Sequence, residues 1–212
     1  MAKILRLVLP VIYIAMLSLT LLFSFSVKHD LSNLDIISRQ QTSLQNLSRS
    51  LLLCGLMGND IQFAHTTEEI QGVLDTYGSE YTALDKSFEQ LNVLTKNPSE
   101  LEHLERAHTL AIKTDKVARK LFDVLMRDDA SPMGKFQIAI AGMHKIEKLT
   151  AQIMDDVALL SASFETQARE KKSELELNIN AIEGLAFGSL IALSLFGIKS
   201  MLTGRPPSSK NS

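Results

Sequence analysis

The middle of the chain is patterned as a series of amphipathic helices. From residue 31 onward, apolar side chains recur every seven residues on one seam, with a second seam beside it, and this spacing lines one face of a helix. The positions are Ile37, Leu44 and Leu51, with Leu47, Cys54 and Ile61 on the second seam. Gly55 and Gly58 weaken this helix, and we expect a turn over residues 60–67.

Capping residues divide the chain after this turn into three further helices. Thr66 and Glu69 form a capping box at the start of the second helix. The turn at residues 97–99 ends it, Ser99 is the expected cap of the third helix, and Pro132 is expected at the first position of the fourth. The expected cores of these helices are Ile70, Val73, Tyr77, Leu84, Phe88 and Leu91; Leu101, Leu104, His108, Ala111, Val117, Leu121 and Val124; and Phe136, Ile140, Met143, Ile146, Ile153, Val157, Leu160 and Phe164.

Four such helices and no strand pattern predict an all-α fold. Short turns favour antiparallel neighbours, so we expect an up-down-up-down four-helix bundle over residues 28–180. We expect the fourth helix to continue without a break into an apolar stretch at residues 181–202.

The two ends of the chain have the composition of membrane spans. Residues 7–27 contain no charged residue and are long enough to cross a bilayer, so residues 1–27 are predicted to be a short tail and a first transmembrane helix. A cleaved signal peptide is the alternative, because Ser24 and Ser26 have the small side chains that such cleavage requires. Residues 181–202 are the second predicted span, in which Glu183 and Lys199 would reach the interfaces. A water-facing helix is the alternative there.

Charge is distributed unevenly. All 24 acidic residues lie between Lys28 and Glu183, and five of the 22 basic residues lie outside that range, which leaves 17 basic residues and a net charge of −7 in the middle. Such a surface argues against nucleic acid as a partner. The basic ends place both termini in the cytoplasm and the bundle outside it, with residues 203–212 as a short cytoplasmic tail.

Polar residues cluster on the first helix of the bundle. Gln40 interrupts the apolar seam, Arg39 precedes it, and Gln45 and Arg49 are four residues apart on one face. A solvated face is the simplest interpretation. The alternative, on which our site prediction rests, is that Arg39, Gln40, Gln45 and Arg49 bind a small anion or an amino acid through charge-assisted hydrogen bonds.

Other candidate sites carry less signal. Gly184, Gly188 and Ala192 form a small-residue stripe suited to close helix packing, either against the first span or in self-association. Cys54, the single cysteine, fits a helix seam, with an intermolecular disulfide as the alternative. His103 and His108 are badly spaced for a shared metal, so we predict no metal and no cofactor. Nothing resembles a nucleophile with its base or a phosphate loop, so we predict no enzyme.

The order of segments resembles the sensor half of bacterial chemoreceptors and sensor kinases: basic tail, span, four-helix bundle, span, then Arg205 and Pro206. Residues 36–49 are also loosely similar to the first-helix motif of the nitrate-sensor and PilJ-type branch, matching it at Arg39, Gln40 and Gln45, with Ser38 where a glycine is expected. The resemblance implies a bacterial inner membrane protein with a periplasmic sensor domain.

The expected function comes from this resemblance and from the length of chain after the second span. About ten residues remain there, too few for the linker and output domains of such a receptor. We therefore expect either a truncated receptor or a stand-alone protein that binds a ligand or partner outside and transmits helix displacement to another membrane protein, as a homodimer or with that partner. A structural accessory subunit of a membrane complex, without a small ligand, is the alternative.

Overall fold

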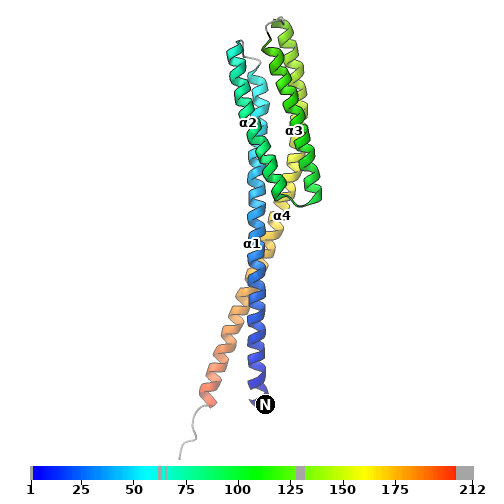
Figure 1. Ribbon diagram of the computed structural model, residues 1–212. Coiled ribbons are helices and arrows are strands. Elements are labelled where there is room, and N and C mark those ends of the chain that lie inside the picture. Colours follow the sequence, from blue (N-terminus) through cyan, green and yellow to red (C-terminus); the bar gives the residue numbers. More distant parts are fainter. Residues whose placement is uncertain (1, 62–63, 65, 128–131, 204–212) are drawn as a thin grey trace, which may run out of the picture. The chain divides into compact units, whose positions relative to one another are not determined.

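The described part of the chain forms four helices (Figure 1). A computed structural model describes residues 2–61, 64, 66–127 and 132–203. The helices are α1 (Ala2–Asp60), α2 (Thr67–Leu94), α3 (Pro98–Leu125) and α4 (Pro132–Thr203), and these described ranges contain no strand. The all-α prediction is confirmed, as is the unbroken helix from Pro132 into the second apolar stretch.

Local capping chemistry explains where α2 and α3 begin. Thr66 accepts a hydrogen bond from the Glu69 amide, and the Glu69 carboxylate accepts one from the Thr66 amide, so the predicted capping box is confirmed. The prediction that Ser99 caps α3 was wrong. Asn97 is the cap, because its Oδ1 accepts from the Ser99 amide at 3.1 Å and Pro98 occupies the first helical position, where its missing donor costs nothing.

The chain divides into two compact units. One is Asp35–Ala168, called here the four-helix unit because all four helices contribute to it. The other combines Met1–Leu34 with Arg169–Ser212 and is called here the two-helix unit. Whether membrane boundaries fall at residues 27/28 and 180/181 stays a prediction.

Two buried clusters form the core of the four-helix unit, and the first contains side chains from all four helices. The seam predicted on α1 is buried throughout, as are most predicted positions on the other helices. Phe136 and Ile140 are exceptions, with 51% and 45% of their surface exposed, so their assignment to the core was wrong. Ala139, which was not predicted, is buried there beside Met143 and Ile146, which were.

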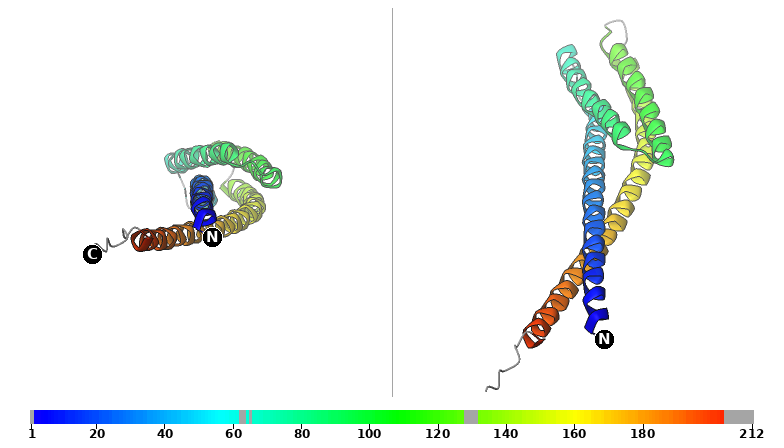
Figure 2. Two further views of the ribbon diagram at one scale, coloured as in Figure 1. Left: turned by 90° about the horizontal axis from the view of Figure 1, so that it is seen from below. Right: turned by 60° about the horizontal axis from the view of Figure 1, so that its bottom comes forward.

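Polar contacts tie neighbouring helices of the four-helix unit together. Contacts between α1 and the α2 region pair residue 40 with residues 94–95, residue 43 with residue 90 and residue 50 with residue 80, so residue numbers fall on α2 as they rise on α1. Residues 100 and 106 of α3 contact residues 163 and 156 of α4, again in descending order. Figures 1 and 2 show α3 alongside the first half of α4.

The two-helix unit pairs the first part of α1 with the last part of α4. The Asn178 side chain donates hydrogen bonds to Ser26 and Asp30, and a side-chain atom added at Gly188 would lie 3.6 Å from the Met16 methyl group. Both α1 and α4 are long and apolar enough to cross a membrane, within Val11–Met57 and Met133–Leu195, and no part of either apolar window is buried.

Candidate functional site

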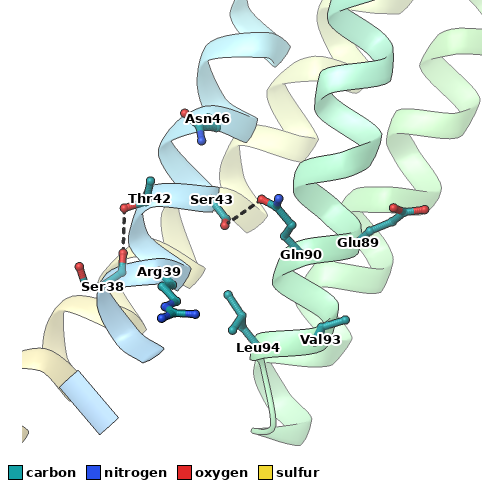
Figure 3. A pocket seen from close by; sticks show the side chains of 9 residues that line it. All are labelled: Ser38, Arg39, Thr42, Ser43, Asn46, Glu89, Gln90, Val93 and Leu94. Carbon is teal, nitrogen blue, oxygen red and sulfur yellow. Dashed lines mark hydrogen bonds between the residues drawn. The ribbon is translucent and has the colours of Figure 1, made fainter. Parts of the chain in front are cut away.

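A groove of about 600 Å³ lies between α1 and α2 in the four-helix unit (Figure 3). The two helices pack against each other on the side that faces the core, and the groove runs between their outward faces. The lining residues are Ser38, Arg39, Thr42, Ser43 and Asn46 from α1, and Glu89, Gln90, Val93 and Leu94 from α2.

Hydrogen bonds already position part of this lining. The Ser43 hydroxyl donates to Gln90 Oε1 at 3.3 Å, which leaves both protons of the Gln90 amide nitrogen available to a ligand. The Thr42 hydroxyl donates instead to the Ser38 carbonyl of its own helix at 2.9 Å. Asn46 makes no side-chain hydrogen bond within the described residues.

Arg39 supplies the positive charge of the groove. Its Nη2 lies 2.9 Å from Asp35 Oδ2, one turn earlier on α1, and both side chains are mostly exposed. Exposed pairs of this kind contribute little stability. The guanidinium is therefore able to exchange Asp35 for a ligand anion at small cost, and Figure 3 shows it extending toward Leu94.

The structure separates the four residues predicted from the sequence. Arg39 lines the groove. Gln40 is buried with 4% of its surface exposed, and its amide donates to the Leu94 carbonyl at 3.2 Å and the Thr95 hydroxyl at 3.4 Å. Gln45 and Arg49 are exposed and do not line the groove. A binding role for these residues stays a prediction, and the geometry gives Gln40 a structural task.

Sequence reasoning missed the other polar residues that line the groove with Arg39. Ser43 and Asn46 lie four and seven residues after Arg39, so helical spacing alone could have placed them on its face. Gln90 and Glu89 could not be found this way, because only the packing of α2 on α1 brings them near.

No protein-family model matches the chain, and no curated protein or solved structure is significantly similar to it. The residues themselves therefore carry the evidence for function.

A second polar cluster joins α3 to α4. Asp156, whose side chain is 3% exposed, accepts from Arg106 Nε at 2.8 Å and contacts His103 Nδ1 at 2.9 Å. The Arg106 guanidinium holds the pKa of Asp156 below its usual value; burial opposes this effect, and His103 adds to it. His108 belongs to a different group, since it contacts Asp85 and stacks on Phe88. Among the residues that the structure describes, no three potential ligands gather as a metal site.

Cys54 and the small-residue stripe lie in different units of the chain. Cys54 is buried in the core of the four-helix unit, and burial raises the pKa of its thiol to about 12, so it stays protonated and inert. Gly188 faces Met16 of α1 at contact distance, whereas nothing lies within 4 Å of the position a side chain at Gly184 would occupy. Gly188 therefore packs against α1, and self-association through the stripe stays a prediction.

Proposed function

We propose that the chain is a two-span membrane protein whose four-helix unit binds a small ligand or a protein partner outside the membrane and transmits helix displacement to another membrane protein. The observation that carries this proposal is the set of large apolar side chains exposed on both segments of the two-helix unit, such as Phe25 at 76%, Leu21 at 68% and Phe187 at 67%. Water-facing apolar surface costs about 25 cal/mol per Å², whereas helices with apolar surfaces are stable in lipid.

The charges at the chain ends support the proposed orientation, and the order of contacts along the helices supports the proposed topology. Lys3 and Arg6 precede the first apolar stretch, and Arg205 and Lys210 come after the second, which favours two cytoplasmic termini. The descending contacts between consecutive helices support an up-down-up-down bundle with both spans at one end. The resemblance to chemoreceptor sensor halves makes the bacterial inner membrane the proposed location, with the bundle in the periplasm.

The groove between α1 and α2 is the proposed ligand site. Arg39 offers a guanidinium, and Gln90 and Asn46 offer amide donors that no described residue uses up. Val93 and Leu94 provide an apolar wall beside them. This combination suits a small carboxylate or amino acid, whose oxygens accept from the donors while its carbon skeleton lies on the wall.

Thermal unfolding of the detergent-solubilised full chain tests the proposal against individual amino acids, small carboxylates and nitrate. We expect at least one probe to raise the unfolding temperature, as binding to the folded state requires. Arg39→Ala should abolish that increase, and Arg49→Ala should retain it because Arg49 lies outside the groove. The ligand role is wrong if no probe stabilises the chain, or if both variants respond like the parent.

Exposed apolar residues on the four-helix unit favour a second candidate, an accessory subunit held by protein contacts alone. Leu52 and Leu56 on α1 and Met133, Phe136 and Ile140 on α4 are all more than 40% exposed. A membrane protein that copurifies at equal stoichiometry, and that is lost in Leu52→Ser with Leu56→Ser while no probe changes stability, would favour this role.

A further inference from the structure

A buried carboxylate joins the two segments of the two-helix unit. Asp30 of α1 is only 4% exposed. Its Oδ2 accepts a hydrogen bond of 2.9 Å from the side-chain nitrogen of Asn178 of α4, and the same nitrogen donates to the Ser26 hydroxyl at 3.1 Å. Ser26 and Asp30 are one turn apart on α1, so a single amide on α4 is held between two successive turns of α1.

The contacts of this unit set the relative direction of its segments. Met16 lies against Gly188, and Ser26 lies against Asn178. Residue numbers on α4 fall as those on α1 rise, so the segments run in opposite directions. Any sliding of one along the other therefore has a defined consequence for Asn178.

Sliding α4 by one turn, about 5.4 Å, toward the amino end of α1 would remove the donor from Asp30. Asn178 would then face Leu22 and Ser26, and Glu174 or Leu175 would take its place beside Asp30. An ionised glutamate has no proton to donate, and leucine offers none. The charge of Lys171 interacts with both Glu174, its ion-pair partner, and Asp30, but this slide would also bring the Glu174 carboxylate toward Asp30, so the two negative charges would have to share one cation. A buried carboxylate without its donor is strongly unfavourable.

Sliding α4 by one turn in the opposite direction would have a smaller cost. Asn178 would then lie between Asp30 and Leu34 and could keep its bond to the carboxylate. Only the Ser26 contact would be lost, and a serine hydroxyl in a helix can donate to the carbonyl four residues earlier instead.

We infer that Ser26, Asp30 and Asn178 form a one-way register lock, which blocks displacement of α4 toward the amino end of α1 while permitting displacement the other way. The lock would restrict which helix movement can pass between the four-helix unit and the ends of the chain. It does not depend on the identity of any ligand, so it stands or falls separately from the proposed function.

Disulfide trapping in the full-length chain tests the lock in membranes, in a Cys54→Ser background. Met16→Cys is combined in turn with Gly188→Cys, which reports the register of the structure, with Gly184→Cys, which reports sliding toward the amino end of α1, and with Ala192→Cys, which reports sliding away. Oxidation rates of the intrachain disulfide are measured by mass spectrometry of digested monomer. Disulfides require close approach of the two positions, so the rates report register.

We expect the 16/188 disulfide to form fastest and the 16/184 disulfide to form more slowly than 16/192. Asn178→Leu should raise the 16/184 rate relative to 16/192 by about tenfold, the worth of a hydrogen bond to a charged group. Asn180→Leu is the matched control, because Asn180 is exposed and makes no such contact.

Two results would overturn the lock: a parent chain in which 16/184 forms as fast as 16/192, or an Asn178→Leu chain whose ratio equals that of the Asn180→Leu control. Should Asn178→Leu fail to accumulate, Asp30→Ala removes the buried acceptor itself, and the same comparison of ratios decides.

Discussion

Replacing Gln40 with alanine should destabilise the chain without weakening ligand binding. The buried Gln40 amide donates to the Leu94 carbonyl and the Thr95 hydroxyl at the end of α2. Carbonyls in the last turn of a helix have no partner in their own helix, and Thr95 is itself 4% exposed. Depriving buried acceptors of a donor costs about 1 to 3 kcal/mol. For a chain of this size, that lowers the unfolding temperature by about 2 to 12 °C.

Circular dichroism of the detergent-solubilised chain measures this change, and Gln45→Ala is the control. Gln45 lies on the same helix but is exposed, so its truncation should change stability by less than about 0.5 kcal/mol. Equal melting curves for the two variants would refute the structural role of Gln40. So would a Gln40→Ala variant that melts like the parent but no longer responds to a ligand that stabilises the parent.

Two further substitutions test the contact between α3 and α4. A side-chain atom added at Gly142 would lie 3.1 Å from the methyl groups of the buried Leu121, whereas Gly78 has open space. We therefore expect Gly142→Val to lower the free energy of unfolding in urea by about 1 to 3 kcal/mol relative to Gly78→Val. Arg106 lowers the folded-state pKa of Asp156. The contact between these two side chains therefore contributes fully to folding stability above the unfolded-state pKa of Asp156, and its contribution is lost as pH falls through the folded-state pKa. Unfolding measured from pH 7 to pH 2 should show a weaker acid dependence in Asp156→Asn.

Most of the helical architecture could be predicted because its signals are local. The apolar seam containing Ile37, Leu44 and Leu51 needs only helical periodicity, and the capping box at Thr66 needs four consecutive residues. Ser99 was misassigned because Asn97 and Ser99 both have side chains that can cap a helix. Pro98 between them selects Asn97, because proline is favoured at the first helical position. Phe136 was misassigned because periodicity does not say which of two apolar faces a neighbour will cover.

The candidate site was less predictable, because it depends on pairs of residues distant in the sequence. Gln40 and Arg39 are adjacent in the chain, yet one is buried against the end of α2 and the other lines a groove. Gln90 enters that groove only because α2 packs on α1. Asp30 and Asn178 are 148 residues apart in the sequence, and no local pattern predicts their contact.

Sidedness of the chain in a membrane is the most direct test of the central claim. Single cysteines replace Ala2, Ser79 and Ser209 in turn in a Cys54→Ser background, and intact bacterial cells are treated with a maleimide that does not cross the inner membrane. Ser79 is exposed on the four-helix unit, so we expect a cysteine there to be labelled. Cysteines at positions 2 and 209 should be labelled only after lysis. Labelling of either terminus in intact cells, or protection of position 79, would contradict the two-span arrangement.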